Sequence, residues 1–291
     1  MPARRPLVSL APAKVNLSLR IGRRRSDGFH EIDSVLQTLE LADEVRLSFD
    51  GLRGVTVGGP FAAGTPADES NIAWRAAVEL AQSLGHSLGR LSIHLEKRIP
   101  PAGGLGGGAS DAATALRLLQ RAWGNVPEEA LFDAANAVGS DVAFFLVGGT
   151  ARARGRGDRV SRLPDHPRRE IVLFVPSATI ESKTARMFAV FDAMVPEPET
   201  LPGPDAPIAL VSTTKDVVNT FEELAPSVFP GLADLQAAIQ IRISERVRLA
   251  GAGPTLFWIG DTGQGANIAT RAVGLPCTVI ETATARSLWQ P

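Results

Sequence analysis

The sequence predicts a protein of mixed helices and strands in two units, and three observations lead to this expectation. Apolar and polar residues alternate over residues 8–21, as they do in a half-buried strand. A strand, a glycine-rich loop and a helix follow one another without a gap over residues 91–119. Residues 163–169 contain two prolines and precede a buried strand at residues 170–176, which starts a second, strand-rich unit. We therefore expect the boundary between the units within residues 163–169.

Composition and charge limit the classes to which the chain can belong. Its 291 residues are enough for one large domain or two smaller ones, and a formal net charge of −1 gives no overall attraction to nucleic acid or to an anionic membrane. The single cysteine, Cys277, excludes an internal disulfide and a cysteine-built zinc site, and it fits a reducing compartment. Residues 1–10 lack the apolar stretch of a signal peptide, and no apolar run approaches the ~20 residues that span a bilayer. We expect a cytoplasmic monomer or homodimer without partners among nucleic acids or membranes.

Residues 100–111 carry the most informative motif. Five glycines fall within six positions, between an alternating strand at residues 91–97 and an alanine-rich helix that runs through Leu119. Glycine lets the backbone lie against a ligand, and Ser110 or Asp111 can cap the helix that follows. Free N–H groups at a helix start bind phosphate. We therefore expect an anion-binding loop; a flexible linker is the alternative, which the tight flanking by strand and helix disfavours.

Common phosphate-loop motifs do not fit this segment. A Walker loop requires lysine where Ala109 stands, and the dinucleotide fingerprint requires glycine at the same position. The catalytic loop and metal-binding triplet of protein kinases are missing from the sequence.

The pattern Pro-x-x-x-Gly-Leu-Gly-Gly-Gly-x-Ser-Asp-Ala-Ala at residues 100–113 resembles the ATP loop of the GHMP kinases, the superfamily of galactokinase, homoserine kinase, mevalonate kinase and phosphomevalonate kinase. Its triple glycine and its ending resemble the subfamily that phosphorylates 4-diphosphocytidyl-2-C-methyl-D-erythritol. Ala109 replaces a serine that is usual there, which removes one phosphate contact and leaves the backbone loop intact. The resemblance implies ATP contacts from Pro101, Ala102, Gly103, Gly104, Leu105, Gly106, Gly107, Gly108, Ala109, Ser110 and Asp111.

A second motif lies in residues 11–17. Lys14 and Asn16 share one face of the predicted strand by its two-residue period, and Pro12 suits a strand edge or a bulge. Composition alone favours a solvent-exposed face. The sequence Pro-Ala-Lys-x-Asn-Leu, however, resembles the opening motif of the same kinases, which implies that Lys14 lies at the phosphoryl-transfer site and Asn16 beside the acceptor.

Phe29 and His30 follow an Asp-Gly turn signal. Such a pair is usually a core aromatic ring beside a solvent-exposed imidazole. In the similar kinases the matching segment holds the cytosine of the acceptor, so the resemblance makes both residues substrate-binding. Phe29 replaces a tyrosine in a chain that has none, but stacking on a base requires only the ring face. The arginines of residues 23–25 form either a solvated turn or a patch that steers the anionic substrate.

Three further candidates each have two interpretations. Asp141 stands before an apolar run and is either a helix cap or, by the resemblance, the catalytic base. Asn71 caps a predicted helix, and the resemblance places it beside the adenine of ATP. Lys97 is either a solvated strand end or an ATP contact.

Other segments complete the expected organisation. We expect strands at residues 45–49 and 55–57, helices at 70–81, 127–138 and 183–194, a hairpin at 148–159, a loop at 196–207, a helix junction joining the two halves at 217–222, and a second glycine turn at 249–257. This turn resembles the third motif of the superfamily, with Ala250 and Ala252 in place of serines.

The resemblance covers nearly the full chain through three motifs in the same order. It implies an α+β GHMP kinase fold, with an N-terminal ribosomal-protein-like ATP-binding domain at residues 1–165 and a C-terminal ferredoxin-like domain at residues 166–291. It also implies transfer of a phosphoryl group from ATP, with Mg²⁺ carried by the nucleotide and no metal site formed by the protein, to the acceptor's 2-hydroxyl in the non-mevalonate route to isoprenoid precursors. Another GHMP small-molecule kinase and a non-catalytic nucleotide-binding protein are the alternatives; the segment 27–30 disfavours the first, and retention of Lys14 and Asp141 disfavours the second.

Overall fold

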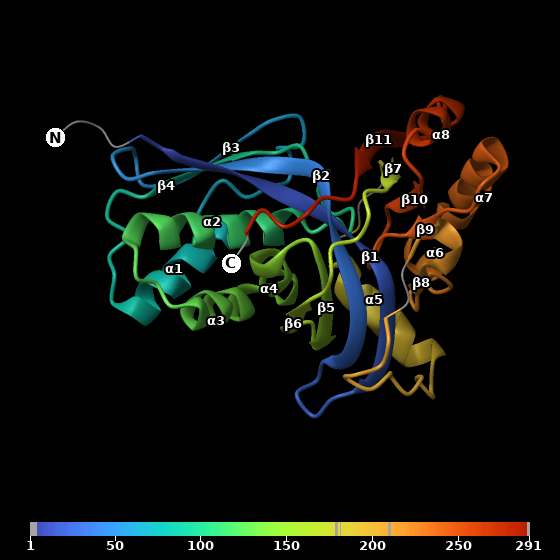
Figure 1. Cartoon of the computed structure of the whole chain (residues 1–291), viewed down its shortest axis with the longest axis horizontal. Helices are drawn as coiled ribbons and strands as arrows, with labels where there is room; N and C mark the ends of the chain where they lie inside the picture. The colour runs from blue at the N-terminus through green and yellow to red at the C-terminus, as the bar shows by residue number, and fades with distance from the viewer. Residues whose placement is uncertain (1–4, 178–179, 181, 209–210, 290–291) are drawn as a thin grey trace.

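Two sheets and two groups of helices form four layers in this computed structural model, which describes residues 5–177, residue 180, residues 182–208 and residues 211–289 (Figure 1). The first sheet has the strand order β3-β4-β2-β1-β8, and β5 pairs with β2 and β6. Its strands are β1 (Leu7–Arg24), β2 (His30–Ser48), β3 (Gly54–Gly58), β4 (Ser92–Glu96), β5 (Thr150–Gly155), β6 (Arg159–Arg162) and β8 (Val218–Asn219). One face is covered by α1 (Ile72–Leu84), α2 (Gly107–Trp123), α3 (Glu128–Val138) and α4 (Ser140–Val147).

The second sheet is antiparallel throughout, in the order β11-β7-β10-β9. Its strands are β7 (Glu170–Pro176), β9 (Arg248–Leu249), β10 (Leu256–Gly260) and β11 (Cys277–Ala283). Its outer face packs with α5 (Lys183–Met194), α6 (Ala225–Val228), α7 (Leu232–Ile243) and α8 (Gly265–Arg271), and a short 3-10 helix spans Thr214–Asp216. No helix in the described part of the chain combines the length and the apolar composition needed to cross a membrane.

Alternation along the strands explains how the sheets stack. In β7, Ile171 and Leu173 face a cluster shared with the first sheet, whereas Val172 and Phe174 face the outer helices. The strand is apolar at consecutive positions because both of its faces are covered. The shared cluster also contains Val15 of β1 and Leu105 of the glycine loop. The loop is thus anchored in the apolar contact between the two sheets.

Most predicted elements agree with the structure. The strand at 170–176 and the helix at 183–194 have the predicted bounds, the helix capped by Asn71 is α1, and the predicted hairpin is β5–β6. The predicted strand at 45–49 is only the end of β2, which begins at His30. Pro12 stands at a register shift between β1 and β2, as the bulge prediction required.

Two predictions about local structure were wrong. Residues 217–222 form the short strand β8 and a turn rather than a helix junction, although β8 does join the halves by pairing with β1. Ser110 and Asp111 do not cap α2, because the left-handed conformation of Gly106 (φ 77°) lets the helix begin at Gly107. The division at residue 165 stays a prediction; the chain returns to the first sheet at β8.

Candidate active site

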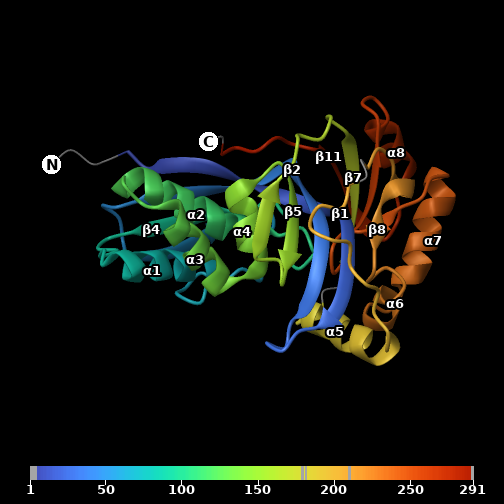
Figure 2. The ribbon, with the colours of Figure 1, turned by 60° about the horizontal axis from the view of Figure 1, so that its bottom comes forward.

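A cavity of about 900 Å³ lies between the two groups of helices and is lined by all three sequence motifs. The helix α5 lies beside the end of the β1–β2 hairpin and forms one side of the cavity (Figure 2). The predicted site residues that line the cavity are Lys14, Asn16, Phe29, His30, Asn71, Lys97, Pro101, Ala102, Gly103, Gly104, Leu105, Gly106, Gly107, Gly108, Ala109, Asp111 and Asp141. Ser110 does not line it: its hydroxyl is fully buried in α2, so the expected ATP contact of this residue is not supported.

Close packing explains two glycines of the loop. Gly104 has a φ of 84°, and a Cβ there would lie 2.4 Å from the carbonyl oxygen of Ala250. A Cβ on Gly106 would lie 2.7 Å from the ring of Phe145. The backbone N–H of Lys14 donates to the carbonyl of Leu105 at 2.9 Å, which fixes the loop to β1. The loop is therefore held by its backbone in one conformation, with its N–H groups at the start of α2 free for an anion.

Lys97 is not a solvated strand end. The residue is 3% exposed, and its ammonium group lies between the carboxylates of Asp43 and Asp111. Asp43 also accepts the backbone N–H of Ile99 at 2.8 Å. Burial raises the pKa of the Asp111 carboxyl to about 7, against the opposing effect of the Lys97 ammonium group. This cluster ties α2 to β2 and to the residue that follows β4, next to the glycine loop.

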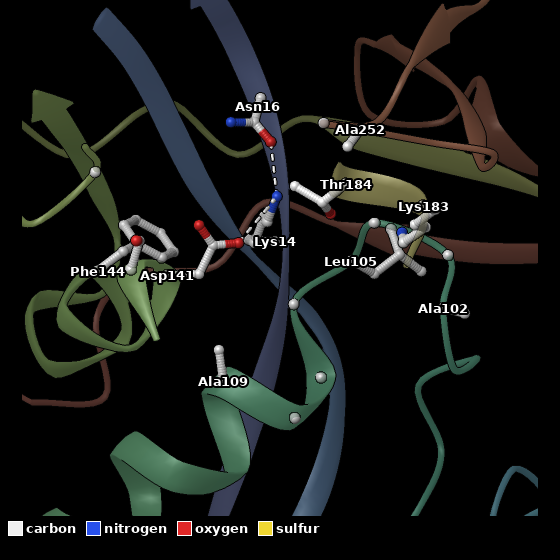
Figure 3. A pocket seen from close by; sticks show the side chains of 18 of the residues that line it. Lys14, Asn16, Ala102, Leu105, Ala109, Asp141, Phe144, Lys183, Thr184 and Ala252 are labelled. Atoms are coloured by element: carbon white, nitrogen blue, oxygen red, sulfur yellow. Dashed lines mark hydrogen bonds and ion pairs between the residues drawn. The ribbon is translucent and has the colours of Figure 1, made fainter. Parts of the chain in front are cut away.

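Lys14 and Asp141 meet over the start of α2, where Ala109 lies (Figure 3). The Nζ atom of Lys14 lies 3.6 Å from Oδ2 of Asp141 and donates to Oδ1 of Asn16 at 2.7 Å. Asn16 in turn donates to the hydroxyl of Ser34 at 2.8 Å. The Lys14 side chain is buried and that of Asp141 is 51% exposed, so the cation is fixed and the carboxylate is open to a ligand. The exposed-face interpretation of β1 was therefore wrong, and Asp141 lies in the first turn of α4 rather than at its cap.

The opposite end of the cavity contains the Phe29–His30 pair. Their burial is the reverse of the usual expectation: Phe29 is 48% exposed, with the guanidinium of Arg156 5.3 Å from its ring, and His30 is 6% exposed. The His30 ring stacks on Phe188 at 5.2 Å, and its Nε2 atom lies 2.9 Å from the carboxylate of Asp192. Flat rings, a ring nitrogen and a carboxylate can hold a planar base by stacking and hydrogen bonds.

Asn71 fills its predicted local role. Its side-chain oxygen accepts the N–H of Ala73 at 2.9 Å, and its amide donates to the carbonyl of Pro66 at 2.7 Å. Both polar groups of the side chain are thus used by the protein, while the residue lines the cavity.

Several cavity residues were missed by sequence reasoning. They are Ser34, Arg156, Lys183, Thr184, Phe188 and Asp192. Four of them lie in α5, whose sequence has no glycine or lysine motif. The sequence predicted this helix, and the family resemblance suggested substrate contacts in the region without assigning a residue; in the structure Met187 and Phe191 are buried and the positions between them face elsewhere. The packing position of α5 determines which of its remaining side chains face the cavity.

Comparison with known proteins agrees with these motifs. Residues 71–149 match the family described as GHMP kinases N terminal domain. The chain is 36% identical over 271 residues to the 4-diphosphocytidyl-2-C-methyl-D-erythritol kinase of Jannaschia sp. (strain CCS1), which covers 91% of this chain and 92% of the relative. It is 34% identical over 294 residues to the enzyme of the same name from Thermobifida fusca (strain YX), and the alignment covers 94% of this chain and 93% of the relative.

Solved structures give the same result. A crystal structure of 4-(cytidine 5'-diphospho)-2C-methyl-D-erythritol kinase aligns with a TM-score of 0.73 and 30% identity, over 96% of this chain and all of the other. The mevalonate kinase of L. major, in complex with R-mevalonate, aligns with a TM-score of 0.71 and 15% identity over 97% of this chain and 96% of the other. This similarity shows a common fold. The chain therefore belongs to the 4-diphosphocytidyl-2-C-methyl-D-erythritol kinases of the GHMP kinase superfamily.

Proposed function

We propose that this cavity carries out the reaction of the family, transfer of the γ-phosphoryl group of ATP to the 2-hydroxyl of 4-diphosphocytidyl-2-C-methyl-D-erythritol in the non-mevalonate route to isoprenoid precursors. The observation that carries the proposal is the pairing of Lys14 Nζ with Asp141 Oδ2, 3.6 Å apart, beside the glycine loop. A phosphoryl transfer requires positioning and charge neutralisation more than covalent chemistry. A fixed cation and an open carboxylate beside a phosphate loop meet that requirement.

Asp141 acts as the base. The proton of the acceptor's 2-hydroxyl passes to its carboxylate, the hydroxyl oxygen forms a bond to the γ-phosphorus, and the bond to the bridging oxygen breaks to release ADP. The half-exposed carboxylate is open to the acceptor, and the ammonium group of Lys14 lies 3.6 Å from it.

Lys14 stabilises the charge on the transferring phosphoryl group. Asn16 holds its ammonium group in place through the 2.7 Å hydrogen bond, and Ser34 holds Asn16. The bond from the Lys14 backbone to Leu105 fixes the distance between this cation and the glycine loop. Lysine and loop therefore form one rigid support for the phosphates.

ATP lies along the loop, whose N–H groups from Gly103 to Ala109 bind its phosphates, with Asn71 and Lys97 in the adjoining wall. Because its buried ammonium group lies between the carboxylates of Asp43 and Asp111, Lys97 contributes by holding α2 in position rather than by contacting phosphate. Mg²⁺ carried with the nucleotide would neutralise charge on the polyphosphate, and the open carboxylate of Asp141 is an acidic group of this chain that would face it.

The acceptor's cytosine lies at the far end, against Phe29 and His30. Phe188 stacks on His30 and extends the same apolar surface. A cytosine stacked on the exposed face of Phe29 would replace water on that ring, and Asp192 lies close enough to His30 to take part in hydrogen bonding to the base.

The test is coupled ADP release with ATP and Mg²⁺, with the cytidyl substrate offered beside mevalonate, homoserine and galactose. Turnover with the cytidyl substrate alone supports the proposal. Turnover with another acceptor keeps the ATP loop and rejects the cytosine site, and ATP binding without any turnover rejects the catalytic roles of Lys14 and Asp141.

A further inference from the structure

A second lysine faces the phosphoryl-transfer site from the opposite wall. Lys183, the first residue of α5, lines the cavity, and its Nζ atom donates to the carbonyl of Gly253 at 2.5 Å. That carbonyl packs against the glycine loop, because a Cβ on Gly104 would lie 3.1 Å from it. Figure 3 shows the Lys183 side chain over the loop segment that contains Leu105, on the side away from Asp141.

One glycine turn connects the two lysines. A Cβ on Gly251 would lie 3.0 Å from the Nζ atom of Lys14, and two residues later Gly253 accepts the hydrogen bond of Lys183. The turn is itself joined to the loop, since the N–H of Thr255 donates to the carbonyl of Gly103 at 3.3 Å. Lys14 and Lys183 therefore lie at two ends of one short segment that packs on the phosphate loop.

The hydrogen bonding of Lys183 leaves donors for a ligand. An ammonium group has three N–H donors, and hydrogen bonds within the described residues use one of them. The side chains of Ala109 and Ala252, which also line this end of the cavity, end in methyl groups and donate no hydrogen bond (Figure 3). The described residues that bring a cationic side chain to phosphate oxygens here are Lys14 and Lys183, beside backbone N–H groups and the hydroxyl of Thr184.

We propose that Lys183 is a second cation of the phosphoryl-transfer site, which binds the γ-phosphoryl group of the nucleotide from the side of the glycine turn while Lys14 binds it from the side of β1. This inference rests on the kinase activity proposed above. Lys183 neither gives nor takes a proton in the transfer; it neutralises charge on the equatorial phosphoryl oxygens, and the proton goes to Asp141.

The protonation of the Lys183 amine provides a second measurement that tests the inference. Burial, and then the positive charge of Lys14, lower the pKa of the Lys183 amine to about 7, against the opposing effect of Asp141. The charged groups that face the amine are thus Lys14 on β1 and Asp141 on α4, while the glycine loop and the turn contribute backbone groups. At pH values above this pKa the neutral amine predominates in the absence of a ligand. A bound polyphosphate favours the ammonium form, so binding should take up a proton.

The experiment compares Lys183→Met with Lys183→Arg and with Arg186→Met, a control that removes a cation from the same helix outside the cavity. We expect kcat to fall about a hundredfold to a thousandfold in Lys183→Met, as when one aimed donor is removed, and to stay within about twofold in Arg186→Met. Calorimetric binding of a non-hydrolysable ATP analogue at pH 8, in buffers of different ionisation enthalpy, should show proton uptake in the wild type that Lys183→Met lacks. Wild-type turnover in Lys183→Met, or unchanged proton uptake, would overturn the inference.

Chemical rescue separates charge from shape if Lys183→Arg is also impaired. In a Cys277→Ser background, which removes the native thiol, Lys183→Cys treated with bromoethylamine regains an ammonium group of nearly the original length. Recovered turnover supports the inference, and no recovery in a folded protein, with treated Cys277→Ser fully active, contradicts it. Asp141→Asn distinguishes the two proposals: if it abolishes turnover while Lys183→Met does not, the proposed function stands and Lys183 has no part in it.

Discussion

The two walls of the cavity are held in different ways. The donor wall, which is the glycine loop with the start of α2, is fixed by backbone hydrogen bonds to β1 and by the buried cluster of Lys97, Asp43 and Asp111. The acceptor wall, which is α5 with residues 27–30, is anchored by the buried Met187 and Phe191, but contacts on its cavity side include side chains partly open to solvent, such as the 41% exposed Asp192 against His30.

This difference predicts different consequences for mutations. Backbone bonds and buried charges fix the donor wall before any ligand arrives, so changes there should lower both stability and ATP binding. Side-chain contacts at the surface contribute little to stability. Changes in the exposed, cavity-facing side chains of the acceptor wall should therefore affect acceptor binding and leave folding nearly intact.

The largest effect is expected at the point where the walls meet. Asp141→Asn should lower kcat by about a hundredfold to ten-thousandfold at nearly unchanged ATP affinity, since it removes the base and keeps the shape of the side chain. Steady-state ADP release and nucleotide titration measure the two quantities. Asp133→Asn, on the exposed face of α3, is the matched control. Turnover within a few-fold of the wild type would remove Asp141 from its role.

Breaking the donor wall should destabilise the whole protein. Lys97→Met leaves two buried carboxylates without their cation, and removing one partner of such a group costs about 3–5 kcal/mol. Urea unfolding measures this free energy, with Lys215→Met as a control at an exposed lysine. Equal losses in the two variants would show that the cluster does not hold the wall.

The loop's backbone can be tested with two neighbouring glycines. Gly106→Ala places a side chain in the left-handed region and against Phe145, so we expect a loss of about 2 kcal/mol or more in stability and weaker ATP binding. Gly108→Ala is the control for stability, because its Cβ would meet only Ile72 at 3.4 Å within a helix. If both substitutions are tolerated alike, the loop is not held as described.

On the acceptor wall, Phe29→Ala should raise the KM for the cytidyl substrate. Loss of a stacked base costs about 1–3 kcal/mol, whereas the 48% exposed ring contributes little to folding. Phe29→Tyr keeps the ring face and should bind the acceptor as the wild type does. An unchanged KM in Phe29→Ala would place the base elsewhere.

The last prediction concerns the pH dependence of stability. The Asp111 pKa of about 7 lies above the ordinary value of 3.8, so between these limits the folded state holds a proton that the unfolded state has released. This contribution to stability is complete below pH 3.8 and is lost as pH rises through 7. Asp111→Asn should lack this loss, so the difference in unfolding free energy between the two proteins should change between pH 5 and 8. Parallel plots of unfolding free energy against pH for the two proteins would contradict this prediction.

Residues whose role follows from local sequence were predictable. The glycine loop, the strand with Lys14 and Asn16, the cap at Asn71 and the positions of β7 and α5 depend on turn chemistry and on short periodicity, which neighbouring residues determine. Motif resemblance added Asp141, whose local pattern by itself allowed a cap. The family assignment also followed from the ordered motifs and was confirmed by full-length relatives.

Tertiary structure alone decided which side chains meet across the chain. Asp43 is far from Lys97 and Asp111 in sequence, and nothing local marks its buried carboxylate as their partner. Sequence periodicity could show that α5 is a helix, but its docking against β1, β2 and the 251–253 turn determines that Lys183, Phe188 and Asp192 face the cavity. Charge pairing and cavity lining depend on distances between separate elements, and the packing of the two sheets sets these distances. A sequence motif contains information only about residues that are close together in the chain.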